Sequence, residues 1–165
     1  MAKIPPDIVL RYDIRPGDIG LVVYLHGLLF AKEHGFSDTF EAQVAASLAE
    51  FYLSFKPDKE RLWIAEKNGR IIGSVGIIES SQLQARLRWL LVDTANRRIG
   101  LGKVLLDEAI DFCKQGGYKS IFLETFSELT TAGRLYKSAG FKITEEKTKK
   151  LFGKTVTEQQ YMLKL

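Results

Sequence analysis

Arg97-Arg98-Ile99-Gly100-Leu101-Gly102-Lys103 joins an apolar run at 87–92 to a segment at 103–115 with helical periodicity. Apolar residues in and just before that segment recur at the spacing of one helix face: Leu101, Leu105, Ala109, Phe112 and Cys113. The local order is therefore strand, short loop and helix, with two glycines where the loop becomes the helix.

This loop has the composition of an anion-binding site. Glycine allows a tight turn and a close approach of the backbone to a ligand, because no side chain intervenes. The first amides of a helix have no partner within it, and the helix dipole adds partial positive charge there. Arg97, Arg98 and Lys103 add full charges. We predict a diphosphate site; the alternative is a tight turn with three solvated cations.

A resemblance to a known family favours the diphosphate. Arg97-x-x-Gly100-x-Gly102 after Leu90-Leu91-Val92-Asp93 resembles the acyl-CoA pyrophosphate loop of the GCN5-related N-acetyltransferase (GNAT) superfamily. A second block, Leu135-Tyr136-Lys137-Ser138-Ala139-Gly140-Phe141, resembles the C-terminal tyrosine motif of the same family. The two blocks have the family's order and spacing, and the resemblance covers nearly the whole chain.

Within the superfamily, the chain looks closest to acetyltransferase domains that are often fused behind a MarR-type winged helix. The segments that carry this resemblance are His26-Gly27, Glu33-His34-Gly35, 135–141 and Phe152-Gly153-Lys154. The resemblance identifies the superfamily but does not identify the substrate.

The composition is that of one globular domain. The chain has 165 residues, of which 45% are hydrophobic and 27% are charged. Its formal net charge is +4, but much of the excess lies near the predicted phosphate loop and in the lysines of 147–154. Glu145 and Glu146 lie beside those lysines, as expected of a solvated strand face. We therefore do not expect a nucleic-acid partner.

The cysteine content and the absence of long apolar runs bear on the location of the protein. Cys113 is the single cysteine, so it cannot form an internal disulfide, and it lies on the apolar face of a predicted helix. The N-terminus has no charged leader followed by an apolar run, and no segment has the length of a membrane span. We expect a cytoplasmic protein without membrane contact, and no metal site.

The remaining segments predict a mixed α/β domain. Strands are expected at 8–14, 62–66, 71–78, 87–92, 120–126, 143–151 and 156–163, and helices at 19–33, 39–55, 103–115 and 130–137. Asp18 is the predicted N-cap of the first helix, and Asp38 or Thr39 that of the second. Asn68-Gly69 predicts a tight hairpin turn.

The helix at 103–115 separates two strands, and a strand-helix-strand crossover favours a parallel pair. We therefore expect a mixed, mostly antiparallel sheet with helices on both faces. The resemblance to the GNAT fold adds that the central parallel pair is splayed. The chain 1–165 is expected to be a single N-acetyltransferase domain.

The resemblance also implies how acetyl-CoA, the expected acyl donor, would bind. In the family, the pantetheine arm enters the gap between the splayed strands and pairs with the backbone of the first strand, here at Leu90 and Val92. Backbone amides from Arg98 to Lys103 would hold the diphosphate. The predicted donor site is made of Leu90, Leu91, Val92, Arg97, Arg98, Ile99, Gly100, Leu101, Gly102 and Lys103.

Tyr136 is the candidate general acid, by resemblance to the family tyrosine that lies near the sulfur of the thioester. A phenol has an ordinary pKa of about 10, so it stays protonated at neutral pH and can donate to a leaving thiolate. The alternative is that Tyr136 only packs on its helix with Leu135.

The general base is less well defined, because many relatives have a glutamate on the strand before the glycine loop where this chain has Arg86. His26, Phe30 and Glu33 share one helix face that would line the acceptor side of the cleft. His26 or Glu33 could therefore take the proton of the amine, directly or through water. A buried structural histidine and an exposed helix carboxylate are the alternatives.

Arg86 and Arg88 alternate with apolar residues, so both should point from one face of the strand. Two guanidinium groups near the cleft would attract a carboxylate and repel a polycation. This favours an amino-acid-like acceptor or a peptide terminus, bound by Arg88 and Phe30. The alternative is a solvated strand face, or an ion pair with Glu79.

Taken together, the residues and the resemblance predict an acyl-CoA-dependent N-acyltransferase that acetylates a primary amine of a small molecule or peptide by direct attack. One alternative is a binding module that senses acyl-CoA without turnover. A second alternative, suggested by the sequence pI of about 9.1, is a protein that binds nucleic acid. The expected partners are acetyl-CoA and an amine-bearing acceptor, and the prediction allows for a homodimer.

Overall fold

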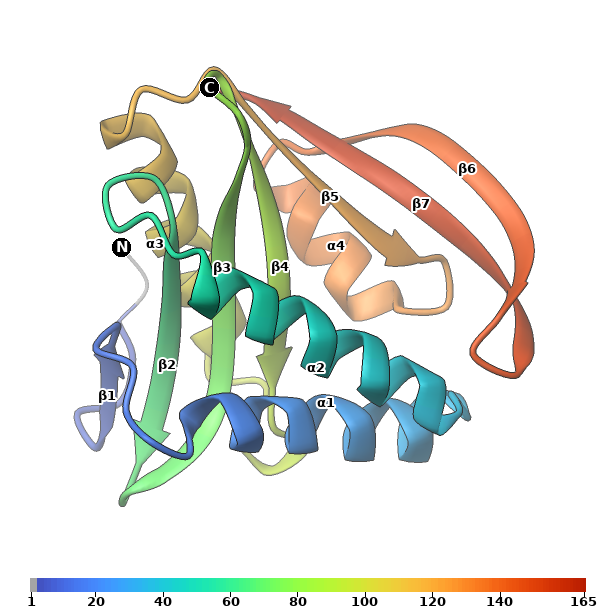
Figure 1. The fold of residues 1–165 in the computed structure, drawn as a ribbon, viewed down its shortest axis with the longest axis horizontal. Coiled ribbons are helices and arrows are strands. Elements are labelled where there is room, and N and C mark those ends of the chain that lie inside the picture. The colour runs from blue at the N-terminus through green and yellow to red at the C-terminus, as the bar shows by residue number, and fades with distance from the viewer. Residues whose placement is uncertain (1–2) are drawn as a thin grey trace.

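The computed structural model describes residues 3–165 and contains one seven-stranded sheet with the strand order β1-β2-β3-β4-β5-β7-β6 (Figure 1). The strands are β1 (Ile8–Arg11), β2 (Arg61–Lys67), β3 (Arg70–Ser81), β4 (Gln84–Val92), β5 (Ser120–Phe126), β6 (Lys142–Leu151) and β7 (Lys154–Lys164). The helices are α1 (Asp18–His34), α2 (Asp38–Leu53), α3 (Leu101–Gln115) and α4 (Thr130–Ser138), with a 3-10 turn η1 (Thr94–Asn96).

Neighbouring strands are antiparallel except for β4 and β5. These two strands pair in parallel only from Gln84 to Arg86, opposite Ser120 to Phe122. Beyond Arg86 they diverge, and a wedge opens between them, with α1 and α2 lying across its wide end (Figure 1). The predicted mixed sheet with a splayed parallel pair is confirmed.

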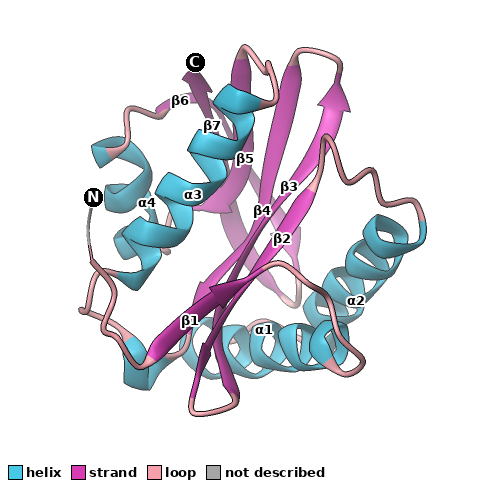
Figure 2. Cartoon of the chain, turned by 90° about the vertical axis from the view of Figure 1, so that its left-hand side faces the viewer, coloured by secondary structure: helices cyan, strands magenta, loops and turns pink. Residues whose placement is uncertain are grey.

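The helices cover both faces of the sheet, as predicted (Figure 2). On one face, α3 packs the side chains of Leu101, Leu105, Leu106 and Ala109 against the sheet, and Cys113 is fully buried among them. On the other face, α1 and α2 contribute Val22, Val44, Leu48 and Phe51 to a second core. The splayed strands between the two cores are therefore held from both sides.

Strand β4 changes face at Trp89. Its side chains alternate between buried and half-buried positions, but Trp89 has a positive φ of 54°, and the pairing with β3 shifts there. Leu87 consequently packs in the α3 core and Trp89 in the α1/α2 core. Opposite the bulge lies Gly76, where any added Cβ would come within 2.4 Å of the indole ring. The bulge occurs where β4 leaves β5.

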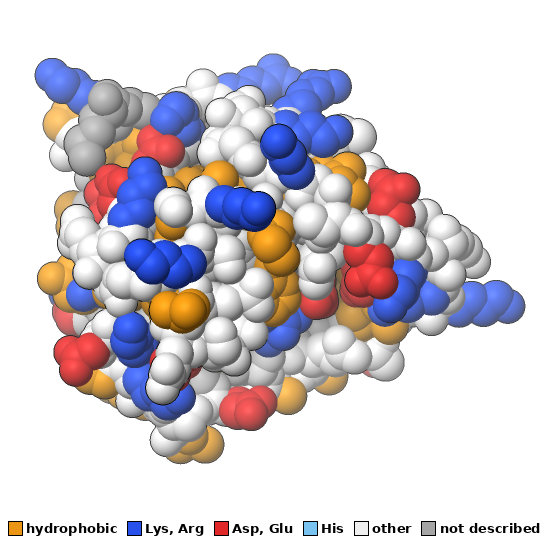
Figure 3. Space-filling model, turned by 90° about the horizontal axis from the view of Figure 1, so that it is seen from above, with side chains coloured by type: hydrophobic (Ala, Val, Ile, Leu, Met, Phe, Trp, Pro, Cys, Tyr) orange, Lys and Arg blue, Asp and Glu red, His pale blue; other side chains and the backbone are white. Residues whose placement is uncertain are grey.

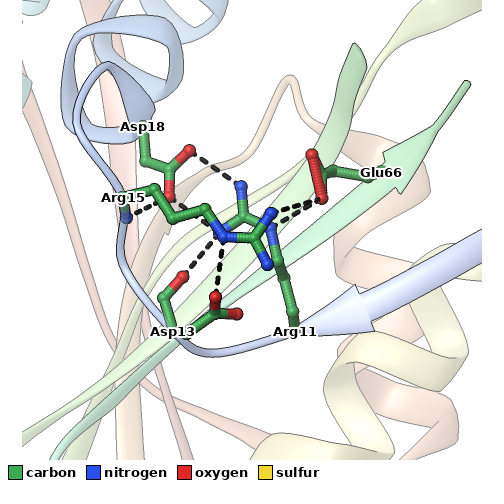
Figure 4. A network of polar contacts seen from close by, with 5 residues as sticks. All are labelled: Arg11, Asp13, Arg15, Asp18 and Glu66. Carbon is green, nitrogen blue, oxygen red and sulfur yellow. Dashed lines mark hydrogen bonds and ion pairs between the residues drawn. The ribbon is translucent and has the colours of Figure 1, made fainter. Parts of the chain in front are cut away.

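Asp18 is not the N-cap of α1, so that prediction is wrong. Gly17 takes the cap position, and Asp18 is the first helical residue. Its carboxylate accepts hydrogen bonds from Arg11 at 2.7 and 2.8 Å and from the backbone amide of Arg15 at 2.7 Å (Figure 4). Arg11 also donates to Glu66 of β2 at 2.6 Å, so a buried ion-pair network joins β1, β2 and α1.

Several other boundaries differ from the prediction by a few residues. The N-cap of α2 is Ser37, before Asp38 and Thr39, and α2 ends at Leu53. β1 ends at Arg11, three residues before the predicted boundary at position 14, where the chain turns to form the network described above. The turn at Asn68-Gly69 has positive φ angles of 51° and 73°, which confirms the predicted hairpin.

Candidate active site

Two adjoining cavities lie where β4 and β5 diverge. The larger one, about 580 Å³, faces the loop before α3 and is called the loop cavity. The smaller one, about 220 Å³, lies against β4, β5 and the first two helices and is called the strand cavity. Four residues line both cavities: Phe30, Leu90, Leu129 and Ala132. The two cavities therefore meet at the wedge between the strands.

The loop cavity gathers the residues predicted to bind the acyl donor. It is lined by Leu90, Leu91, Val92, Arg97, Arg98, Gly100, Leu101, Gly102 and Lys103. Ile99, the tenth predicted residue, is exposed and does not line it. The loop and the end of β4 thus form one continuous wall.

Gly100 makes the N-terminus of α3 available to an anion. It has a positive φ of 84° and is the N-cap of the helix. The first hydrogen bond of the helix runs from the amide of Val104 to the carbonyl of Gly100 at 3.1 Å. The amides of 101–103 precede this bond, so they have no partner within the helix. They lie at the positive end of the helix dipole, beside the loop cavity.

The three predicted cations of the loop are not equivalent. Arg97 is held by Glu33 of α1 through two hydrogen bonds of 2.9 and 2.8 Å, and its Nε donates to the carbonyl of Val92 at 3.0 Å. Lys103 pairs with Asp107 within α3. Among the described residues, Arg98 has no ion pair, so it is the loop cation that is free to meet an anion.

Glu33 lies at the loop cavity, whereas His26 lies at the strand cavity, so the structure separates the two candidate bases. The hydrogen bonds from Arg97 lower the pKa of the Glu33 carboxyl, and its burial opposes them. Thr94 also donates to this carboxylate at 3.3 Å. Glu33 therefore connects α1 to the phosphate loop, and its carboxylate is already hydrogen-bonded to Arg97 and Thr94.

His26 is buried, with 3% of its surface exposed, and lines the strand cavity. Its Nδ1 lies 2.8 Å from the carbonyl of Val22, which can only accept, so Nδ1 carries the proton and Nε2 is the free acceptor. Burial lowers the pKa of His26 to about 4, with a smaller contribution from the charge of Arg88. The imidazole is therefore neutral at pH 7.

Tyr136 of α4 also lines the strand cavity and is buried. Its ring packs against Phe141 and Tyr161, with centroids 5.9 and 5.6 Å apart. Burial raises the pKa of the phenol well above its ordinary value, so the hydroxyl remains protonated. The ring is fixed by packing, as the alternative interpretation required, and it also reaches the cavity, as a general acid requires.

Arg86 and Arg88 both lie at the strand cavity, in agreement with their predicted shared face. Arg86 pairs with Glu124 of β5 at 3.1 Å, and its Nε is buried without a hydrogen-bond partner in the described part of the chain. The alternative partner, Glu79, instead binds Lys56 at 2.6 Å, so that expectation is wrong. Burial and, to a smaller extent, the nearby charge of Arg86 lower the pKa of Arg88 to about 10.

Four phenylalanine side chains form one wall of the strand cavity, which the sequence pattern did not predict: Phe30, Phe40, Phe126 and Phe152. They are called the aromatic wall. Only Phe30 was predicted to bind substrate. The other three come from α2, the end of β5 and the turn between β6 and β7. No spacing in the sequence connects these segments, because they meet only through the docking of the β6–β7 hairpin on α1 and α2.

Three further features concern other kinds of ligand. In the part of the chain from 3 to 165, no helix has the length and apolar character of a membrane span. Across the same residues, no group of three or more histidine, cysteine, aspartate and glutamate side chains is placed to hold a metal ion. On the face shown in Figure 3, lysine and arginine side chains are spread among apolar and acidic ones.

Comparisons with known proteins agree with this geometry. A model of the acetyltransferase (GNAT) family matches residues 23–141. The chain is 28% identical over 116 residues to the probable N-acetyltransferase camello of Xenopus tropicalis, covering 69% of this chain and 52% of that protein. It is 31% identical over 118 residues to an uncharacterized N-acetyltransferase of Schizosaccharomyces pombe, covering 70% and 72%.

Human N-acetyltransferase 8 is 32% identical over 87 residues, which are 50% of this chain and 38% of that protein. The chain thus spans about half or less of the camello and human relatives. The fold is similar to that of yncA from Salmonella typhimurium, solved with its cofactor acetyl-CoA, with a TM-score of 0.77, 17% identity and coverage of 96% and 94%. The family match covers most of the chain and includes the loop before α3 and Tyr136. The chain belongs to the acetyltransferase (GNAT) family.

Proposed function

We propose that this protein is an acyl-CoA-dependent N-acyltransferase that transfers acetyl from acetyl-CoA to a primary amine of a small molecule or peptide. The observation that carries the proposal is the junction of two cavities in the wedge between β4 and β5. One cavity has an anion-binding loop, and the other has a buried, protonated tyrosine. Relatives that are named N-acetyltransferases support the same activity.

The donor would lie along β4 in the loop cavity. Its diphosphate would bind the amides of 101–103 and Arg98. Beyond Arg86, the edge of β4 that faces β5 has lost its strand partner, so its backbone groups can pair with the two amides of the pantetheine arm. Leu90 lines both cavities, so an arm that follows β4 would bring the thioester to the junction.

The reaction needs no covalent intermediate with the protein. The nitrogen of the neutral amine attacks the thioester carbonyl carbon, a C–N bond forms, and the C–S bond breaks. The CoA thiolate takes the hydroxyl proton of Tyr136 and leaves as the thiol. The amine nitrogen loses one proton, which returns to Tyr136 through solvent. The products are an acetamide and CoA.

His26 is the candidate acceptor of the amine proton, because its Nε2 is the free ring nitrogen and the residue lines the strand cavity. A neutral imidazole with a low pKa is a weak base, so the acceptor ammonium would lose its first proton to water. His26 would then accept the more acidic proton of the tetrahedral adduct, directly or through water. Glu33 would act indirectly, by holding the phosphate loop through Arg97.

A non-catalytic acyl-CoA sensor is the second candidate. The two carboxylates at the strand cavity are both paired, Glu124 with Arg86 and Glu158 with Lys149, and neither is free to act as a base. The resemblance to domains fused behind MarR-type regulators fits the same function. For either function we propose a single domain over 1–165 in the cytoplasm, with a homodimer as one candidate assembly.

An amine-library screen that measures free CoA thiol separates the two candidates. The enzyme predicts release of thiol that depends on particular amines and saturates with acetyl-CoA. The sensor predicts that acetyl-CoA raises the melting temperature by binding the folded state, while no amine increases thiol release above the background rate. If acetyl-CoA neither stabilises the folded protein nor turns over, both proposals are wrong.

A further inference from the structure

Arg88 lines the strand cavity, and among residues 3–165 its guanidinium group has no ion-pair partner. Its Cζ lies 5.1 Å from the ring centroid of Trp89, and no described carboxylate pairs with it. Glu124, an acidic residue that also lines the cavity, is held by Arg86 at 3.1 Å. A half-buried arginine without an ion pair loses solvation that a contact with an aromatic ring offsets only in part, so an anion in the cavity would bind it well.

The aromatic wall of Phe30, Phe40, Phe126 and Phe152 encloses another part of the same cavity. The ring centroids of Phe30 and Phe40 are 4.4 Å apart in a stacked arrangement, and Phe40 and Phe152 meet edge to face at 5.1 Å. Such a wall offers only apolar surface and aromatic faces to a ligand. It cannot satisfy a polar side chain, so it selects for an apolar one.

The wall is anchored by the turn between β6 and β7, which docks on the end of α1 (Figure 1). The backbone amide of Ser37 donates to the carbonyl of Phe152 at 2.9 Å. The Nζ of Lys154 donates to the carbonyl of His34 at 2.6 Å and to Glu128 at 2.9 Å. These bonds hold Phe152 in place, so the shape of the wall is preformed.

We propose that the acceptor is an α-amino acid with a free carboxylate and an apolar side chain of aromatic size. This inference rests on the proposed function and names its substrate class. The carboxylate binds Arg88, and the side chain packs on the aromatic wall. The α-amine then faces the junction of the two cavities, where Leu90 and Ala132 border both. The cavity volume of about 220 Å³ equals roughly seven waters at ~30 Å³ each, enough for one such molecule.

A matched acceptor series tests the proposal with the wild-type protein and a saturating amount of acetyl-CoA. The series contains phenylalanine, alanine, phenylalaninamide and phenethylamine, and the readout is kcat/KM from thiol release. We expect phenylalanine to be the best of the four by at least about 10-fold, because the others lack either the carboxylate or the ring. The α-amine of the amide is less basic than that of the acid, so a larger fraction of it is neutral and nucleophilic at neutral pH. A preference for the acid therefore cannot result from a larger supply of neutral amine.

Two substitutions test the two parts of the proposed acceptor site, the carboxylate-binding arginine and the aromatic wall. Arg88→Ala should lower kcat/KM for phenylalanine by roughly 10- to 100-fold and leave the KM for acetyl-CoA unchanged. The charge-matched control is Arg70→Ala, at the exposed start of β3, which should change neither value. Phe40→Leu should reduce the preference for phenylalanine over alanine, because it removes a ring that lines only the strand cavity.

The outcomes distinguish this inference from the function on which it rests. If phenethylamine or phenylalaninamide is acetylated as well as phenylalanine, or if Arg88→Ala affects all four acceptors equally, the inference is wrong and the N-acyltransferase remains. The inference is also wrong, and the N-acyltransferase remains, if kcat/KM for alanine equals kcat/KM for phenylalanine. If no amine of a broad library is acetylated although acetyl-CoA binds, the proposed function and the inference both fail.

Discussion

Acidification from pH 7 to pH 5 should destabilise this protein mainly through His26. The ring is buried, and its Nδ1 donates to the carbonyl of Val22 at 2.8 Å. The pKa of His26 is lowered to about 4, mainly by burial and in part by the charge of Arg88, although the bond to Val22 opposes the shift. In the unfolded chain the ordinary pKa of about 6.5 applies. The folded state therefore binds this proton more weakly than the unfolded state.

The size of the effect follows from this difference of pKa, 6.5 against about 4. Because the folded pKa is the lower one, the stability is fully present above pH 6.5 and is lost as the pH falls toward 4. At 1.36 kcal/mol per pKa unit, the whole loss is about 3 kcal/mol. About 2 kcal/mol of it falls between pH 7 and pH 5, above the range in which ordinary carboxylates titrate.

Urea unfolding at pH 7, 6 and 5 measures this loss, and His26→Gln is the comparison, because it keeps a neutral polar side chain. The free energy of unfolding of the wild type should fall by about 2 kcal/mol more than that of the variant over this range. The two proteins differ only at position 26, so the comparison isolates the effect of that side chain. Equal pH dependence in the two proteins, or an NMR titration of the His26 ring with a midpoint near 6.5, would show that His26 does not cause the loss of stability.

Three further predictions concern the acid, the phosphate loop and the buried ion pair. Tyr136→Phe should lower kcat on the order of 10²-fold with little change in the KM for acetyl-CoA, and an unchanged kcat at saturating acceptor would remove this hydroxyl from the mechanism. Gly100→Val and Gly117→Val should both lower the melting temperature, because their φ angles are +84° and +81°, but only the first should abolish stabilisation by acetyl-CoA. Asp18→Asn should lower the free energy of unfolding by about 3 kcal/mol, because the buried guanidinium of Arg11 loses one of its two carboxylate partners. Asp13→Asn, at an exposed pair, should leave urea unfolding unchanged, and equal effects of the two substitutions would contradict the role of burial.

The strand, loop and helix around Gly100 could be predicted because each depends on neighbours in the sequence. Apolar alternation, two glycines and helical periodicity all lie within 87–115, and the structure forms β4 and α3 over nearly the same residues. The strand-helix-strand order then fixes a parallel pair by a general rule of chain topology. The same local signals explain the correct turn at Asn68-Gly69.

The wrong prediction for Asp18 and the missed role of Glu33 have one cause: their binding partners are distant in the sequence. An aspartate before a helix has the composition of an N-cap, but Asp18 instead meets Arg11, which also binds Glu66, 55 residues further along the chain. Glu33 and Arg97 are 64 residues apart, so nothing local revealed that one candidate base is tied to the phosphate loop.

The bulge at Trp89 and the aromatic wall also could not be predicted from the sequence. A positive φ at a tryptophan has no signature in composition, and it sends the side chain to the opposite core from Leu87. Phe152 reaches the cavity only because the β6–β7 turn docks on α1 through Lys154. In contrast, the shared face of Arg86 and Arg88 was predicted correctly, because strand alternation is a local property.

The proposed function is the transfer of the acetyl group from the thioester to an amine nitrogen. Acetyl-CoA labelled with ¹³C in the acetyl group, incubated with the wild-type protein and an amine pool, tests this transfer directly when every product is resolved by mass spectrometry. An N-acyltransferase should place the label in the acetamide of a particular amine, with one molecule of CoA thiol released for each acetamide formed. If the label appears only as free acetate, or stays on CoA while the protein is saturated with it, the proposed function is wrong.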